Sequence, residues 1–337
     1  MCKAALHTWF TETKRPLPWR DAPTPYRVWI SEIMLQQTRA SVVVPYFERW
    51  MTLFPDVYAL SQAPLEAVIK AWEGLGYYSR ARNLHASAKE IVRSWNGKLP
   101  HTKEALLALP GLGSYTTGAI LSFGFHQRAA AVDGNVIRVM SRYAWIGERV
   151  DQASTKRKIE TVTEEFLDEK EPWVTMEALI ELGATVCTPR PRCSECPLRS
   201  ECEAFCRGMP EALPLQKEKT PTVRLNRTVL VIEAKGAILV KKNEPELLMG
   251  DLWEFPYIEG KQKLKQWGGL NIARGKRMLS IKHSFTRFSA TLFPWHIQAS
   301  EQTFVDGFTW VKLERLKTLP FSSGHRKILE IVCESFI

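Results

Sequence analysis

The sequence has no hydrophobic run that approaches the roughly 20 residues of a membrane-spanning helix. It also lacks a signal peptide, and the N-terminal MCKAALHTWF shows neither a strongly basic amphipathic helix nor a lipidation signal. Internal repeats and low-complexity segments are absent as well. We therefore expect a globular cytoplasmic protein with no targeting signal and no membrane partner.

A clear excess of positive charge is present. Lys and Arg outnumber Asp and Glu by 46 to 36, which gives a net charge of +10. This balance favours a polyanionic partner, and nucleic acid is the first candidate. The 337 residues are 45% hydrophobic, which is enough for two or three domains with their own cores.

The hydrophobic pattern divides the chain into two parts. In residues 1–206 apolar residues recur at helical spacings, as in KEALLALP and TTGAILSFGF, which predicts an all-α domain. Residues 207–226 combine prolines and charges and are typical of a linker. Residues 227–337 contain β-branched runs, a hairpin signal at Lys235-Gly236 and a helical C-terminal pattern, so we predict a small α+β domain.

Glu32 lies in an unusually apolar stretch, VWISEIMLQQT, residues 28–38. If this stretch is helical, three of its four near neighbours on that face are apolar. A carboxyl group against apolar side chains has a raised pKa and suits general acid catalysis. The alternative is that Ser31 and Glu32 lie at a solvent-exposed helix start.

Residues 105–123, ALLALPGLGSYTTGAILSF, predict a helix, a tight turn and a second helix. Gly111 and Gly113 permit close approach of the backbone to another molecule, and the amides that open the second helix suit a phosphate. An ordinary helical hairpin is the alternative. The LPGLG turn followed by a helix of small residues closely resembles the helix-hairpin-helix of DNA repair glycosylases.

Asp133 follows a small apolar run in AAAVDGNVIRV and precedes Gly134-Asn135, as an N-cap residue does. Helix-terminal amides would keep its carboxylate ionised, and an ionised carboxylate is what a positively charged sugar transition state requires beside it. Asp133 could fill both roles.

Four cysteines lie within sixteen residues of loop-like sequence, CTPRPRCSECPLRSEC. Inside a cell such a group is typical of metal ligands, because disulfides are rare there. Zinc is possible, but the unequal spacing favours a four-thiolate iron-sulfur cluster. The arrangement resembles the [4Fe-4S] loop of the endonuclease III superfamily, although the first gap is one residue shorter than that family's usual spacing. The expected ligands are Cys187, Cys193, Cys196 and Cys202.

These motifs together resemble the adenine DNA glycosylases of the MutY type. The resemblance covers LPWR, SEIMLQQT, GLGYYSRARNL, LPGLGSYTTGAI, VDGNVIRV, the four cysteines and a separate C-terminal α+β domain. It implies a multi-domain protein: an all-α helix-hairpin-helix glycosylase domain with an iron-sulfur loop at 187–202, and a Nudix-like domain over 227–337. It also implies a monomer that removes adenine opposite 8-oxoguanine or guanine in double-stranded DNA, nucleoid-associated if the source is bacterial.

The resemblance assigns roles to residues of the first domain. Glu32 would protonate adenine at N7, and Asp133 would stabilise the sugar cation. Tyr115 and Asn135 would line the same site. The base-holding and DNA-contacting residues would be Arg20, Glu177, Gln37, Tyr77, Thr38, Gly111 and Gly113. For Arg20 and Glu177 an ordinary salt bridge is the alternative.

Tyr115 occupies the position where strand-cleaving members of the superfamily carry a nucleophilic lysine. A tyrosine cannot form the imine that such cleavage requires. We therefore expect little or no strand-cleaving (AP lyase) activity.

In the second domain, the family's lesion-reading Phe-Ser-His loop is matched by Phe285, Thr286 and Arg287, for which an ordinary exposed β-turn is the alternative. Arg287 replaces an imidazole with a permanent cation that could bind phosphate instead. No glutamate-rich Nudix hydrolase signature is present, so we expect no pyrophosphatase activity.

Two rival functions remain open at this point. One is a bifunctional endonuclease III-like enzyme, which Tyr115 and the extra domain disfavour. The other is a non-catalytic iron-sulfur DNA-binding module, which the presence of both acids disfavours.

Overall fold

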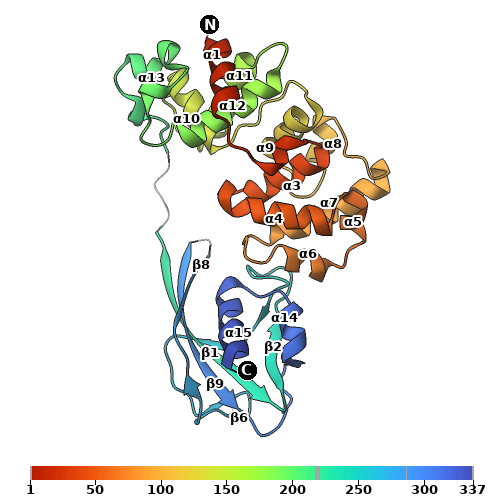
Figure 1. Cartoon of the computed structure of the whole chain (residues 1–337). Helices are drawn as coiled ribbons and strands as arrows, with labels where there is room; N and C mark the ends of the chain where they lie inside the picture. The colour runs from red at the N-terminus through yellow and green to blue at the C-terminus, as the bar shows by residue number, and fades with distance from the viewer. Residues whose placement is uncertain (1, 217–220, 286, 336–337) are drawn as a thin grey trace. The chain divides into compact units, whose positions relative to one another are not determined.

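The computed structural model describes residues 2–216, 221–285 and 287–335 (Figure 1). The chain forms two compact units. The first comprises Met1–Gln62 and Asn83–Glu218, and the second Ala63–Arg82 and Lys219–Ile337. The segment Ala63–Arg82 therefore groups with the C-terminal part of the chain. In the described residues no helix is long and apolar enough to cross a membrane.

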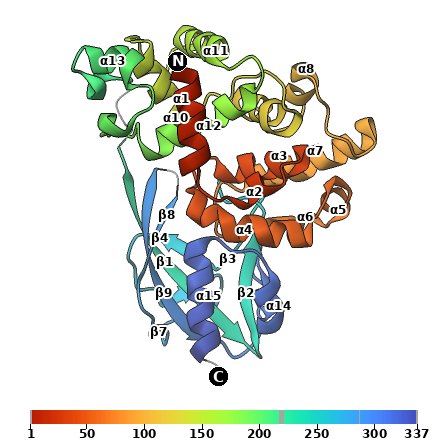
Figure 2. The same cartoon turned by 45° about the horizontal axis from the view of Figure 1, so that its top comes forward.

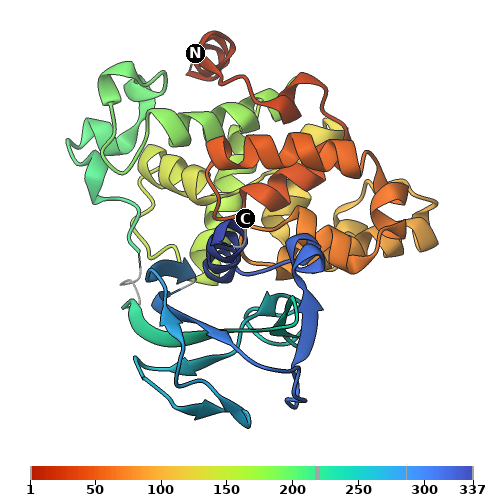
Figure 3. The same cartoon turned by 60° about the horizontal axis from the view of Figure 1, so that its bottom comes forward.

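The first unit consists of helices and loops over its described residues, as predicted for this part of the chain (Figure 3). One helix, α7, continues into it from the second unit. The longer helices are α1 (Cys2–Thr13), α3 (Pro25–Leu35), α4 (Ala40–Leu53), α7 (Ser79–Trp95), α10 (Gly134–Tyr143), α11 (Ala153–Phe166) and α12 (Pro172–Thr185). The shorter ones are α2 (Pro18–Asp21), α5 (Val57–Gln62), α8 (Lys103–Leu107), α9 (Ser114–Ala119) and α13 (Glu203–Cys206), with 3-10 turns at Cys193–Glu195, Arg199–Glu201 and Pro210–Ala212.

Helix α3 is buried nearly all round. The Thr24 side chain caps its start by accepting a hydrogen bond from the Arg27 N–H, and Pro25 occupies the first turn. Trp29, Ile30 and Met34 are completely buried. Helix α3 packs against α4, α9 and the π-helical turn Ile120–Gly124 that continues α9. A helix surrounded on all sides carries even its polar residues into the core.

Two glycines let backbone segments of this unit approach closely. A Cβ at Gly118 in α9 would lie 2.0 Å from the Ala130 carbonyl oxygen, and a Cβ at Gly183 in α12 would lie 2.6 Å from the Asn135 Cβ. The first contact places α9 against the segment that leads into α10, and the second places α12 against the first turn of α10. Helices α1, α10 and α12 pack together on this side (Figure 2).

The second unit contains a mixed sheet with the strand order β10-β2-β1-β9-β7, while β3, β4 and β8 pair with β2, β1 and β9. The long strands β1 and β9 run parallel. One apolar cluster includes residues of the helices α14 and α15, and a second includes Leu230 and Ile297. The strands are β1 (Val223–Ala234), β2 (Ala237–Lys242), β3 (Trp253–Glu254), β4 (Tyr257–Glu259), β5 (Gln266–Trp267), β6 (Leu270–Asn271), β7 (Lys276–Arg277), β8 (Ile281–Phe285), β9 (Phe288–Gln298) and β10 (Thr309–Lys312); the helices are α6 (Leu65–Ala71), α14 (Leu313–Thr318) and α15 (Ser323–Ser335).

The predicted α+β character of this part is confirmed. The hairpin turn between β1 and β2 lies at Lys235 and Gly236, which both have positive φ, as a two-residue hairpin turn requires. The first strand begins at Val223, within the segment predicted as linker.

Substitution of Gly118 by Ala tests the close contact between α9 and the segment before Asp133. The added Cβ would overlap the Ala130 carbonyl, so we expect the free energy of unfolding to fall by about 1–3 kcal/mol. Gly147→Ala is the matched control, since a Cβ there meets no atom within 4 Å. Urea denaturation measures both, and equal midpoints for the two variants would contradict the packing described.

Candidate active site

A cavity of about 1270 Å³ opens in the first unit. Its walls come from α1, α2, α3, α9, α10, α12 and their connecting loops. The structure thus brings together side chains that are far apart in the sequence, such as Arg20 and Glu177, which are separated by 157 positions. The predicted site residues that line it are Arg20, Glu32, Gln37, Thr38, Gly113, Tyr115, Asp133, Asn135 and Glu177.

Glu32 faces this cavity from the core, with only 6% of its surface exposed. The Tyr115 hydroxyl donates a hydrogen bond to its Oε2 atom. Burial raises the pKa of Glu32 to about 7, and the negative charges of Asp133 and Glu177 act in the same direction. The Tyr115 hydrogen bond and the Arg20 charge oppose this rise without cancelling it.

The alternative of a solvent-exposed helix start for Glu32 is therefore wrong. Helix α3 begins at Pro25, two turns earlier, and Glu32 lies among buried residues. A carboxyl group with a pKa near 7 holds its proton in a large fraction of molecules at neutral pH, as a general acid must.

Asp133 is both the N-cap of α10 and part of the cavity wall. Its Oδ1 accepts the N–H groups of Asn135 (2.9 Å) and Val136 (2.8 Å), and its Oδ2 accepts the Asn135 side-chain amide (2.8 Å). Burial raises the pKa of Asp133 in spite of these three bonds, which favour the ionised form. The helix-terminal amides expected to keep Asp133 ionised are thus present, but burial has the larger effect on its pKa.

Arg138 connects this end of α10 to the cysteine loop. It donates to the Asn135 Oδ1 (2.8 Å), to the Gly183 carbonyl (2.7 Å) and to the Cys187 carbonyl (2.7 Å). Asn135 is thereby held between Arg138 and Asp133. Sequence reasoning missed Arg138, because its partners lie on three different segments.

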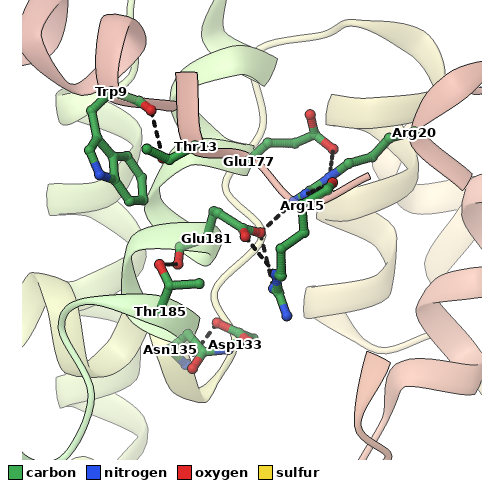
Figure 4. A network of polar contacts seen from close by, with 9 residues as sticks. All are labelled: Trp9, Thr13, Arg15, Arg20, Asp133, Asn135, Glu177, Glu181 and Thr185. Carbon is green, nitrogen blue, oxygen red and sulfur yellow. Dashed lines mark hydrogen bonds and ion pairs between the residues drawn. The ribbon is translucent and has the colours of Figure 1, made fainter. Parts of the chain in front are cut away.

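An ion-pair network lies on the α12 side of the cavity (Figure 4). Arg20 Nε contacts Glu177 Oε1 at 3.3 Å, and Arg20 Nη2 contacts Glu181 Oε2 at 3.0 Å. Arg15 donates hydrogen bonds to both carboxylate oxygens of Glu181, from Nε to Oε1 at 2.6 Å and from Nη2 to Oε2 at 3.0 Å. Arg20 and Glu177 thus form a salt bridge, which was the alternative weighed for them, and this bridge lines the cavity. Arg15 and Glu181 were not predicted.

The four cysteines of the 187–202 loop are free and half-buried. Burial, with a smaller contribution from the other three thiols, raises the pKa of Cys196 to about 12. Buried Arg142 anchors the loop by donating to the Thr188 (2.7 Å) and Pro189 (3.0 Å) carbonyls. Over residues 2–216, 221–285 and 287–335 no three His, Cys, Asp or Glu side chains are arranged as metal ligands. The donor set itself, four closely spaced thiols, fits an iron-sulfur cluster in its chemistry.

Two of the predicted DNA-contacting residues have strained backbones. Gln37 in the first unit and Tyr77 in the second have φ values of 57° and 49°, which non-glycine residues rarely adopt. Both side chains are exposed, and the Arg80 guanidinium lies 5.6 Å from the Tyr77 ring centroid. Such strain is concentrated at functional sites in proteins. Gly111 also has a positive φ, 77°, and does not line the cavity.

The predicted lesion-reading residues belong to the second unit. Phe285 ends β8 and stacks on His283, with ring centroids 5.0 Å apart. The exposed Arg287 lies over the Phe288 ring at 5.3 Å. Thr286 lies outside the described residues.

Comparisons with known proteins identify the families of both parts of the chain. Residues 30–167 match the HhH-GPD superfamily of base excision DNA repair proteins, and residues 227–331 match the NUDIX domain. The adenine DNA glycosylase of Mus musculus is 32% identical over 98% of this chain and 77% of its own length. That of Buchnera aphidicola from Schizaphis graminum is 30% identical over 97% of this chain and 96% of its own length.

Solved structures share the fold of the helical part. A thermostable thymine-DNA glycosylase matches with a TM-score of 0.55 and 25% identity, over 61% of this chain and 95% of its own. An endonuclease III from a non-covalent DNA complex matches with a TM-score of 0.53 and 23% identity, over 61% and 94%. From the near-complete coverage of its relatives and the two matched domains, the chain belongs to the adenine DNA glycosylases of the MutY type.

Proposed function

We propose that this protein is a monofunctional glycosylase that hydrolyses the N-glycosidic bond of adenine opposite 8-oxoguanine or guanine in double-stranded DNA. The observation that carries the proposal is one cavity that holds a buried acid with a pKa of about 7, Glu32, together with a second carboxyl group, Asp133. Membership of the adenine DNA glycosylase family supports the choice of base.

Adenine leaves the sugar readily only after protonation. In the proposed reaction Glu32 transfers its proton to N7 of the base, and the Tyr115 hydroxyl orients the Glu32 carboxyl group. As the bond breaks, the deoxyribose gains positive charge, and the Asp133 carboxylate stabilises it from the cavity wall. Asn135 holds Asp133 through its side-chain amide.

The base must leave the helical stack before this chemistry can occur. Flipping costs a few kcal/mol, and less for a mispaired base. The cavity has room for a nucleotide, and the Arg20–Glu177 pair offers a donor and an acceptor to the base edge. Gln37 and Tyr77 are proposed to fill the vacated position, with Thr38 near the opposite base and Gly111 and Gly113 against the backbone.

We also propose that the enzyme leaves the DNA strand uncut. Strand cleavage in this superfamily needs an amine that forms an imine with the sugar. The residue at that position, Tyr115, is engaged with Glu32 and has no amine to offer.

The second domain is proposed to read 8-oxoguanine. Phe285, supported by its stack on His283, would insert beside the lesion, Arg287 would contact a phosphate, and Thr286 would supply a hydroxyl. The match to the NUDIX domain supports this as a binding module of that fold.

We assign the four cysteines of the 187–202 loop as ligands of a [4Fe-4S] cluster. The cluster, when bound, would supply the four iron–thiolate bonds that fix the loop. Arg138 donates to the Cys187 carbonyl and Arg142 donates to the Thr188 carbonyl. Hydrogen bonds through Arg138 and Asn135 therefore connect the loop to Asp133.

Replacing Glu32 by Gln removes the proposed acid and preserves the side-chain shape. We expect single-turnover excision of adenine opposite 8-oxoguanine to fall by about 100-fold or more, while affinity for the duplex is retained. Breaks in the wild-type product should appear only after alkali treatment. Glu165→Gln, an exposed position on α11, is the control. Wild-type excision rates in the Glu32 variant would refute the mechanism and favour a non-catalytic binding role.

The pH dependence should follow the Glu32 proton. Because the acid form is required, the single-turnover rate of the wild type should decline about tenfold per pH unit above pH 7. Tyr115→Phe removes a hydrogen bond that lowers the pKa of Glu32, so this decline should begin at higher pH in the variant. A decline that begins at the same pH in both proteins would argue against Glu32 as the group that titrates.

A further inference from the structure

Helix α12 carries two glutamates one turn apart, and they differ in their surroundings. Glu177 lines the cavity, and its side chain is 27% exposed. The Glu181 side chain is completely buried and does not line the cavity. A charged side chain buried away from the cavity must be compensated by its neighbours, and it therefore requires a structural or an indirect functional reason.

Both carboxylate oxygens of Glu181 are occupied by guanidinium groups (Figure 4). Arg15 binds Oε1 through Nε at 2.6 Å and Oε2 through Nη2 at 3.0 Å, the bidentate geometry of a strong ion pair. Arg20 binds Oε2 through Nη2 at 3.0 Å. Burial alone would raise the pKa of Glu181, but the two arginines lower it, so the group stays ionised.

Arg20 is held from three directions as a result. Its Nη2 atom points to Glu181, its Nε atom to Glu177 at 3.3 Å, and its Nη1 atom to the Arg15 carbonyl at 3.2 Å. The guanidinium also lies 5.5 Å from the Phe10 ring centroid. Glu181 is therefore one of three acceptors that fix where the Arg20 charge lies.

Arg20 and Glu32 line the same cavity, so the position of the Arg20 charge matters to the Glu32 carboxyl group. Burial has the largest effect on the pKa of Glu32 and raises it; the Tyr115 hydrogen bond from α9 lowers it. Asp133 before α10 and Glu177 of α12 raise this pKa, and Arg20 of α2 lowers it. We propose that Glu181 is a positioning residue that holds and neutralises Arg20, and thereby limits how much positive charge reaches Glu32. This inference rests on the proposed function of Glu32 as the acid.

Glu181→Gln keeps the shape of the side chain and removes its charge. Arg20, no longer neutralised by Glu181, should then favour ionised Glu32. The pH at which single-turnover excision begins to decline should move down by about 0.5 to 1 unit, and the rate above pH 7 should fall accordingly. Glu181→Asp retains the charge and should restore the wild-type profile in large part. Glu165→Gln is again the matched control.

Arg15→Gln provides a second test with the opposite sign. Arg15 is 41% exposed, so this variant is the one better placed to fold. Loss of Arg15 leaves the negative charge of Glu181 less compensated, which should move the decline to higher pH. A role in stability alone would lower the denaturation midpoint of both variants without moving either profile, and this result would overturn the proposal.

Titration of the Glu32 carboxyl by infrared difference spectroscopy, wild type against Glu32→Gln, separates the two claims. It reports the protonation of Glu32 in the full-length protein without any excision. Failure of the wild-type protein to excise adenine would contradict the proposed function. The shift in the pKa of Glu32 caused by Glu181→Gln would still decide the role of Glu181. An unchanged titration in both Glu181→Gln and Arg15→Gln would refute that role.

Discussion

Burial of the Glu32 carboxyl group in the helical core is the constraint on which the rest of the site depends. Helix α3 is enclosed by α4, α9 and the π-helical turn, and only 6% of the Glu32 surface is exposed, so water stabilises the ionised form poorly. Raising the pKa from 4.5 to about 7 costs about 3 kcal/mol of stability, because the ionised carboxylate is less stable inside the protein than in water. This loss of stability develops as the pH rises from about 4.5 to about 7. The packing of the helical core must offset it for the protein to stay folded at neutral pH.

The packing of the helices also places the side chains that interact with Glu32 around it. Gly118 lets α9 approach the segment before Asp133, and Gly183 lets α12 lie against Asn135. Tyr115 at the start of α9 donates a hydrogen bond to Glu32. Asp133 at the start of α10 accepts from Asn135, which in turn accepts from Arg138, and Arg138 donates to the Cys187 carbonyl of the cysteine loop. Glu32 is bonded by Tyr115 of α9, and Glu177 and Glu181 are bonded by Arg20 of α2, so the geometry of the site depends on the packing of the domain.

Local sequence pattern was sufficient for part of this picture. The apolar neighbours of Glu32 indicated its burial, the small residues before Asp133 indicated an N-cap, and Lys235-Gly236 indicated the hairpin. The ion pairs could not be predicted in the same way. Arg15 and Glu181 are 166 positions apart, and Arg138 meets the Cys187 carbonyl 49 positions away. Pairings over such separations depend on tertiary packing, and no local periodicity encodes them. The grouping of Ala63–Arg82 with the second unit likewise depends on tertiary packing and could not be predicted from local pattern.

The central claim is that a proton from Glu32 reaches N7 of adenine before the glycosidic bond breaks. Single-turnover kinetics on a duplex with 7-deazaadenine opposite 8-oxoguanine, compared with adenine in the same duplex, test it most directly, because the analogue has carbon in place of N7. The account predicts that the protein binds both duplexes with similar affinity, excises adenine and leaves 7-deazaadenine in place. Excision of the analogue at a rate comparable to that of adenine would contradict it.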